Sequence, residues 1–216
     1  MGFREQLEAI KRQDPAIKSN LEVFLYPSFW AMGFHKVGHW LYNRKRFFLA
    51  RLVSQIGRGL TGIEIHPGAK IGKGFFIDHG MGVVIGETCE IGDNVLVYQG
   101  VTLGGTGKDT GKRHPTIGNN VLIGSGVKVL GPFKVGDNAR VGAGSVVLRE
   151  VPANATVVGI PARLANEKNR QEYGPLDQIR FPDPISQELN QLRARLQEME
   201  DKIHRLEKKE STDENL

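Results

Sequence analysis

An aliphatic residue returns at every sixth position along the middle of the chain, from Ile65 to about Val158. The spacing is kept within three runs, and the phase changes after Val83 and again between Leu103 and Ile117. The positions are Ile65, Ile71, Ile77 and Val83, then Ile85, Ile91, Val97 and Leu103, and finally Ile117, Ile123, Val129, Val135, Val141 and Val147. An internal period of this kind is typical of a solenoid, here a parallel β-helix of hexapeptide repeats.

Each repeat provides one short strand and one tight turn, so that the aliphatic side chain always points inward. Gly and Asn recur at the corners, in Gly92–Asn94, Gly118–Asn120 and Gly136–Asn138, where we expect backbone with positive φ. With three repeats to a triangular coil, the fourteen positions predict roughly five coils and a prism roughly 20–25 Å tall. Neither the period nor the spacing fixes the handedness of the coil.

Helical periodicity marks the chain before the repeat begins. It predicts an N-terminal α-helical domain over residues 1–60, with one helix from about Ser28 to Tyr42 and another over roughly Phe47–Leu60. The β-helix domain then covers residues 61–165. The fold class is therefore mainly β.

Another pattern follows the repeat. Residues 166–184 contain three prolines and are interpreted as a linker. Over residues 185–207 apolar residues alternate spacings of four and three, which predicts a heptad helix; they are Ile185, Leu189, Leu192, Leu196, Met199, Ile203 and Leu206. Either a coiled coil or a single amphipathic helix lying on the domain would satisfy this pattern. The tail, residues 208–216, is predicted to be disordered.

Composition limits the partners and the compartment. The formal charge of +5 is mild and its basic residues are scattered, so no nucleic acid is expected as a partner. No apolar run approaches the length of a membrane span, and the N-terminus lacks the apolar segment of a signal peptide. The single cysteine, Cys89, rules out an intramolecular disulfide and fits a reducing compartment. We therefore expect a cytoplasmic protein that does not bind membranes.

The first break in the repeat, Asp78–Gly82, holds a candidate base. His79 follows an acid and precedes a glycine, and Glu64 lies fifteen residues earlier. In a coil of about eighteen residues such positions are neighbours on adjacent coils. A carboxylate bonded to one ring nitrogen would fix the tautomer and stabilise the imidazolium. His79 is thus a candidate general base, although a lone histidine is more often structural.

The second break, Gly104–Thr116, is too polar for the prism interior and is predicted to protrude as a loop. Arg113 offers a planar fork for a carboxylate or phosphate, or is simply solvated. Lys108 is followed by Asp109, so the glycines do not form a phosphate loop. Cys89 is interpreted as a packing residue, with a nucleophile as the alternative. The histidines are too widely spaced for a metal site to be favoured.

Several segments together resemble the bacterial serine O-acetyltransferases over roughly residues 10–165. They are Asp14–Ala16, Gly38–Leu41, Ile65–Gly72, Ile77–Gly80, Gly86–Thr88, Gln99–Lys108, Arg113–Pro115 and Gly142–Val147. The resemblance implies a left-handed β-helix. It also implies transfer of acetyl from acetyl-CoA, a co-substrate, to the hydroxyl of L-serine. The products would be O-acetyl-L-serine and CoA, in the first step of cysteine biosynthesis from serine.

The same resemblance implies roles for individual residues. His79 would be the general base and Glu64 its partner, at a position where the family commonly has Asp. Asp14 and Asp78 would hold the ammonium group of serine, Arg113 its carboxylate, and His114 would line the same pocket. The residues implied for the acetyl-CoA groove between subunits are Gly105, Thr106, Ser125 and Ala143, with Arg140 near the phosphates.

The resemblance also implies partners. The helical region is shorter than in members that form hexamers, so we expect a homotrimer. Cysteine is the feedback inhibitor expected at the serine site. The C-terminus, Asn215–Leu216, lacks the terminal Ile by which some members dock into O-acetylserine sulfhydrylase. The partnership with the sulfhydrylase is therefore left open, and we expect the heptad helix to hold the trimer together.

Two rival functions remain open on the residues alone. One is a hexapeptide acyltransferase that acts on a sugar or xenobiotic hydroxyl, which would not need Asp14, Asp78 and Arg113 around an amino acid. The other is a non-enzymatic β-helix scaffold, which would release no CoA with any acceptor.

Overall fold

The computed structural model describes residues 8, 10–11, 17–107, 110–165 and 184–213. Two compact units are present, residues 1–181 and 182–216, and each is described by itself. Asp14 and almost all of the expected linker, residues 166–183, lie outside the described residues. In the described part of the chain no helix combines the length and the apolar character that crossing a bilayer requires.

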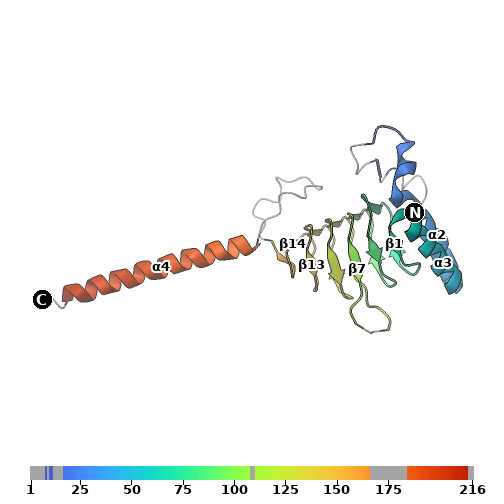
Figure 1. Ribbon diagram of the computed structural model, residues 1–216. Helices are drawn as coiled ribbons and strands as arrows, with labels where there is room; N and C mark the ends of the chain where they lie inside the picture. The colour runs from blue at the N-terminus through green and yellow to red at the C-terminus, as the bar shows by residue number, and fades with distance from the viewer. Residues whose placement is uncertain (1–7, 9, 12–16, 108–109, 166–183, 214–216) are drawn as a thin grey trace. The chain divides into compact units, whose positions relative to one another are not determined.

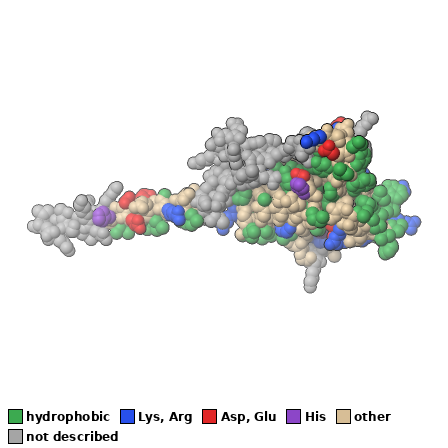
Figure 2. Space-filling model, turned by 45° about the horizontal axis from the view of Figure 1, so that its top comes forward, with side chains coloured by type: hydrophobic (Ala, Val, Ile, Leu, Met, Phe, Trp, Pro, Cys, Tyr) green, Lys and Arg blue, Asp and Glu red, His purple; other side chains and the backbone are tan. Residues whose placement is uncertain are grey.

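Two helices precede the repeat, as the periodicity predicts. After a 3₁₀ turn, η1 (Glu22–Leu25), come α2 (Pro27–Asn43) and α3 (Phe47–Thr61), which pack against each other. Pro27 begins α2, where the missing N–H costs no hydrogen bond. Gly62 ends α3 with φ 71°, the left-handed conformation typical of a helix C-terminus. Figure 2 shows hydrophobic side chains gathered at the end of the molecule where these helices lie in Figure 1.

Short strands then wind into a three-sided prism (Figure 1). Sheet A has the order β1-β4-β7-β10-β13, sheet B the order β11-β8-β5-β2, and sheet C the order β15-β14-β12-β9-β6-β3. The strands are β1 (Glu64–Ile65), β2 (Lys70–Ile71), β3 (Phe76–Ile77), β4 (Val84–Ile85), β5 (Glu90–Ile91), β6 (Leu96–Val97), β7 (Thr102–Gly104), β8 (Thr116–Ile117), β9 (Leu122–Ile123), β10 (Lys128–Leu130), β11 (Lys134–Val135), β12 (Arg140–Val141), β13 (Val146–Val147), β14 (Thr156–Val158) and β15 (Arg163–Leu164). The 5 strands of sheet A confirm about five coils.

The core is a column of stacked aliphatic side chains, as the period predicts. Ile65 pairs in register with Ile85, and Ile85 with Leu103. A second buried row, which the period did not reveal, lies two residues before the first and includes Val83, Cys89 and Val95. Val83 therefore belongs to a corner and not to a strand, which explains the change of phase after it.

The corner glycines differ from the expectation. Asn94, Asn120 and Asn138 have positive φ, as predicted. Gly92 and Gly118 do not, and they are needed for another reason. A Cβ on either glycine would lie within 2.8 Å of the backbone of the next coil, so glycine is needed here for the close approach of two coils of the same chain.

A second apolar cluster covers the outer face of sheet C. Phe76, Leu96 and Leu122 form one row across β3, β6 and β9, and all three are buried. They pack with Val23 and Phe29 from the N-terminal region, and with Ile10. The N-terminal region is therefore fixed to one face of the prism.

The second unit is the helix α4 (Pro184–Asp213). It confirms a helix over the heptads and continues past residue 207 to take in residues 208–213, which the sequence placed in a disordered tail. The seam residues Leu189, Leu192, Leu196 and Met199 are exposed. Their pairing with other copies of the chain stays a prediction.

Candidate active site

His79 lies at a corner of the prism, between β3 of sheet C and β4 of sheet A. Its backbone has φ 60°, its side chain is 77% exposed, and Nε2 lies 4.0 Å from Oδ1 of Asp78. Gly80 follows with φ 82°, and a Cβ there would lie 2.5 Å from the side chain of Ile63. The first break in the repeat is therefore a tight turn that holds an imidazole in solvent.

The turns along this edge of the prism are stacked by backbone hydrogen bonds. The N–H of Gly100 donates to the carbonyl of Met81 (2.9 Å), that of Gly126 to Gln99 (2.8 Å), and that of Gly144 to Ser125 (2.8 Å). Ser125 and the neighbouring Ala143 therefore lie in turns of the same column as His79. Four of the predicted site residues, Asp78, His79, Ser125 and Ala143, share this edge.

Glu64 is held by other partners than the one expected. Its carboxylate accepts a hydrogen bond from Arg51 (3.0 Å) and pairs with Arg58 (3.3 Å), both on α3. The side chain is only 17% exposed. Within the part of the chain that the structure describes, it makes no ion pair or hydrogen bond with His79, and its catalytic role stays a prediction.

The second break forms a loop that projects from another edge, between β7 of sheet A and β8 of sheet B (Figure 1). Gly105 and Thr106 begin the loop and Arg113 and His114 close it. A Cβ on Gly105 would lie 3.1 Å from the Arg113 carbonyl oxygen, so the two ends of the loop run side by side. The four residues are thus brought together, but not with His79.

A carboxylate anchors the arginine of this loop. Nη2 of Arg113 donates to Oε2 of Glu87 (2.5 Å), and the hydroxyl of Tyr42 donates to Oε1 (3.0 Å). Burial acts to raise the pKa of Glu87, but the Tyr42 hydrogen bond and the charges of His66 and Arg113 outweigh it, so the pKa lies below its usual value. Glu87 is therefore ionised at neutral pH and holds the guanidinium at the edge.

His114 is buried, with 8% exposure, where the loop rejoins the stack. Its Nδ1 lies 2.9 Å from the hydroxyl oxygen of Thr88 and accepts a hydrogen bond from the Thr88 N–H (3.2 Å). A Cβ on Gly86 would fall 2.0 Å from the ring, so only glycine fits beneath it. Burial, together with the charge of Arg113, lowers the pKa of His114, so the ring is neutral at neutral pH.

The remaining candidates lie elsewhere. Arg140 stands in the outer row of sheet C, in register with Leu122 and Thr156. Cys89 is buried, and burial raises the pKa of its thiol to about 12, which supports packing and not nucleophilic chemistry. Among the residues described, no group of three or more His, Cys, Asp or Glu side chains is placed to hold a metal ion.

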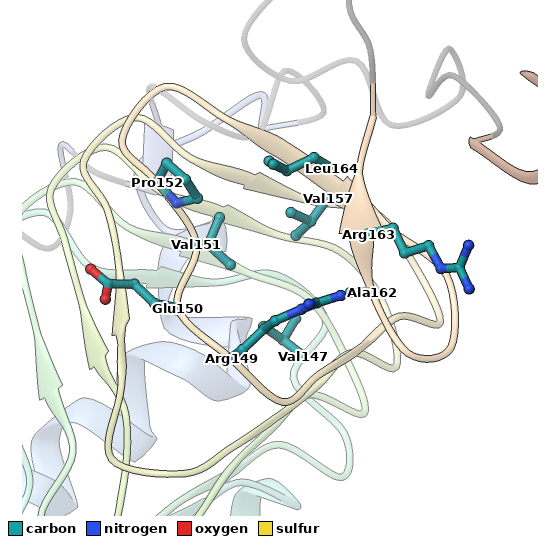
Figure 3. Close-up of a pocket in the computed structure, with 9 residues that line it drawn as sticks. All are labelled: Val147, Arg149, Glu150, Val151, Pro152, Val157, Ala162, Arg163 and Leu164. Atoms are coloured by element: carbon teal, nitrogen blue, oxygen red, sulfur yellow. The ribbon is translucent and has the colours of Figure 1, made fainter. Parts of the chain in front are cut away.

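Sequence reasoning missed the residues that organise the loop, namely Tyr42, Glu87 and Thr88. It also missed a cavity of about 520 Å³ at the last coil, where Val147, Val151 and Val157 line the interior and Arg163 points away from them (Figure 3). No signal marked it, because the positions that line it look like ordinary repeats. None of the predicted site residues lines this cavity.

Comparison with known proteins agrees with the fold. The family of bacterial transferase hexapeptide proteins (six repeats) matches residues 114–149. A serine acetyltransferase of Bacillus licheniformis is 52% identical over 209 residues, covering 96% of this chain and 97% of the relative. One of Staphylococcus aureus is 54% identical over 196 residues, covering 90% and 92%. The chain belongs to the serine acetyltransferase family.

Solved structures of the serine acetyltransferase family share the architecture. The enzyme of Neisseria gonorrhoeae has a TM-score of 0.75 at 39% identity, covering 82% of this chain and 68% of its own. A serine acetyltransferase in complex with coenzyme A from Brucella abortus has a TM-score of 0.74 at 43% identity, covering 76% and 66%. Another, in complex with cysteine, has a TM-score of 0.77 at 40% identity, covering 82% and 69%. Membership confirms the left-handed β-helix and makes the chain an acyltransferase.

Proposed function

We propose that this chain transfers an acetyl group from acetyl-CoA to the hydroxyl of L-serine, giving O-acetyl-L-serine and CoA. This is the first step of cysteine biosynthesis from serine. The single observation that carries the proposal is the turn at His79. This turn holds an exposed imidazole beside Asp78 at a positive φ, a backbone conformation that is uncommon for residues other than glycine.

The chemistry assigned to His79 is general base catalysis. The imidazole takes the proton of the serine hydroxyl while the oxygen attacks the thioester carbonyl carbon. The tetrahedral intermediate collapses, the carbon–sulfur bond breaks, and the imidazolium returns the proton to the departing thiolate. Proton transfer by a positioned base contributes about 10²–10⁴ in rate.

The charges of serine match the other candidates. Arg113 presents a guanidinium for the carboxylate, with His114 beside it, and Asp78 supplies a carboxylate for the ammonium. We assign the second carboxylate to Asp14. Glu64 stays the proposed partner of His79. We propose that the two side chains meet when the substrate or a neighbouring chain binds beside them.

The candidate residues of one chain stand on two different edges of the prism. His79 stands on the edge between sheets C and A, whereas Arg113 and His114 stand on the edge between sheets A and B. We therefore assign each site to two neighbouring chains of a homotrimer, one supplying His79 and the other Arg113. A cyclic trimer repeats such a head-to-tail contact three times and closes.

The acetyl-CoA groove is assigned to the same contact. Ser125 and Ala143 share the edge of His79, and Gly105 and Thr106 share that of Arg113, so neighbouring chains would bring both pairs to the cofactor. Arg140 is assigned to its phosphates. Cysteine is proposed to compete at the serine site, the cytoplasm is proposed as the compartment, and a link to O-acetylserine sulfhydrylase stays open.

Release of free CoA thiol from acetyl-CoA tests the proposal. We expect turnover with L-serine and none with a sugar acceptor. The His79→Ala variant should lose about 10²–10⁴ of the rate. His204→Ala on α4, the matched control, should keep it. Equal turnover by His79→Ala and the native chain would contradict the role of His79, and no turnover with serine would contradict the function.

A further inference from the structure

Thr88 lies at the point where the projecting loop rejoins the β-helix. It follows β4, and the register of Glu90 with Thr116 places Thr88 against His114 on the next coil. The loop separates the two residues by 26 positions in sequence. Nothing in the repeat pattern therefore links them.

Thr88 makes four hydrogen bonds to Arg113 and His114 at the end of the loop. Its hydroxyl oxygen accepts the N–H of Arg113 (3.0 Å) and the N–H of His114 (3.1 Å). The same hydroxyl lies 2.9 Å from Nδ1 of His114, and the Thr88 N–H donates to that nitrogen at 3.2 Å. A hydroxyl has two acceptor sites and one proton. With both acceptor sites taken by N–H groups, its proton goes to Nδ1.

These contacts settle where the proton of His114 lies. A backbone N–H can only donate, so Nδ1 must accept. The neutral ring then carries its proton on Nε2, and Nδ1 cannot be protonated without losing both hydrogen bonds. The lowered pKa of His114, which follows from burial, agrees with a neutral ring. His114 can thus donate through Nε2 but is not placed to act as a base.

The same threonine fixes the position of Arg113. Thr88 holds the Arg113 backbone, and Glu87, the residue before it, holds the guanidinium. Glu87 is in turn held by Tyr42 of α2. The turn after β4 therefore fixes two donors on successive residues, the guanidinium of Arg113 and the Nε2–H group of His114, at one edge of the prism.

We propose that Thr88 is a positioning residue of the acceptor site. Its hydroxyl and N–H hold His114 as the Nε2–H tautomer and orient Arg113, so that both side chains donate to the carboxylate of the acceptor. Thr88 itself does not touch the substrate. The inference rests on the proposed function for the identity of the acceptor, but its tautomer assignment does not.

Two variants test the positioning in the full chain. Thr88→Val removes the hydroxyl at nearly constant volume, and Thr88→Ser keeps it. We expect Thr88→Val to raise KM for serine about tenfold, the worth of one lost hydrogen bond, with KM for acetyl-CoA unchanged. Thr88→Ser should behave as the native chain. Thr116→Val, on the outer face of sheet B, is the matched control. An unchanged serine KM in a folded Thr88→Val variant would overturn the role.

The tautomer is read without any substrate. In two-bond ¹H–¹⁵N spectra of histidine-labelled native protein, His114 should show a protonated Nε2 and an unprotonated Nδ1, and its signals are identified by their loss in His114→Gln. Thr88→Val and Thr88→Ser both keep the backbone N–H that donates to Nδ1, so both should keep this tautomer, and the hydroxyl is tested by the serine KM. A protonated Nδ1 in the native chain would overturn the inference. Absence of serine turnover would instead contradict the proposed function and leave the spectra decisive for Thr88.

Discussion

Cys89 illustrates how a position in the coil decides side-chain chemistry. It belongs to the second inward row and is buried, and its Sγ lies 3.5 Å from the Leu103 carbonyl oxygen. Burial raises the pKa of the thiol from 9.0 to about 12. Because the thiolate is the reactive form, this side chain is chemically inert in the folded protein.

Alkylation with iodoacetamide at pH 8 checks this. We expect no adduct on the native chain and one adduct per chain after unfolding in guanidinium, measured by intact mass.

The same burial predicts a pH effect on stability. Between about pH 9 and 12 the unfolded thiol is ionised while the folded one keeps its proton, so this group makes the protein less stable as pH rises. Cys89→Ala should lessen this loss of stability with rising pH. Rapid alkylation of the native chain would contradict the burial of the Cys89 thiol.

At the scale of elements, the edge between sheets B and C is held by a ladder of asparagines. Nδ2 of Asn94 donates to Oδ1 of Asn120 (3.3 Å), Asn120 to Asn138 (3.2 Å), and Asn138 to Asn154 (3.1 Å). All four have φ between 55° and 59°. Asparagine is suited to this place because it tolerates the left-handed region and also offers a donor and an acceptor.

Substitution of Asn120, at the centre of this ladder, separates the contribution of its hydrogen bonds from that of its backbone conformation. Asn120→Ala removes the ladder hydrogen bonds and also places alanine, which tolerates the left-handed region poorly, at this position. Because both effects are unfavourable, it should lower the free energy of unfolding by about 2 kcal/mol. Asn120→Gly loses only the ladder and relieves the strain, so it should cost about 1 kcal/mol. Denaturant unfolding at equal protein concentration measures both. Equal losses would show that backbone strain has no part.

The elements also show what the sequence could predict. A period of six made the inward residues, the three-sided coil and both breaks visible, because each aliphatic position is set by its own repeat. Contacts across coils were harder to predict. Paired residues on neighbouring coils are 16, 18, 20 or 26 positions apart, because the coils differ in length. Arithmetic with eighteen residues therefore linked Glu64 to His79 and overlooked both Arg51 and the contact between Thr88 and His114.

For the whole molecule, the separation of His79 from Arg113 predicts that association of chains is part of the proposed function. Residues on two different edges of one prism meet only when a second prism lies alongside. We expect a particle three times the 23.9 kDa mass of the chain by light scattering. A monomer would leave the proposed site incomplete.

Mixed trimers test the shared site. His79→Ala and Arg113→Ala chains, which carry different tags, should each have little activity alone. When they are co-expressed and purified through both tags, each mixed trimer should have one intact contact of three and about a third of native activity. Two differently tagged forms of His79→Ala serve as the control and should stay inactive. If the mixed trimers recover nothing while keeping the mass of a trimer, the site does not join these two residues.

One further consequence follows from β15, the single antiparallel strand among those described. Elsewhere every coil presents a parallel edge on which the next coil is built, and nothing in that geometry limits the number of coils or distinguishes a coil of the same chain from one of another molecule. β15 reverses direction against β14, through Val157 with Leu164, and so blocks this growth at sheet C. At the opposite end α3 contacts β1, and Ser54 donates to the Ile65 carbonyl. A molecule closed at both ends in this way is protected from end-to-end fibre formation, and sideways contact between its faces and edges remains the route to assembly.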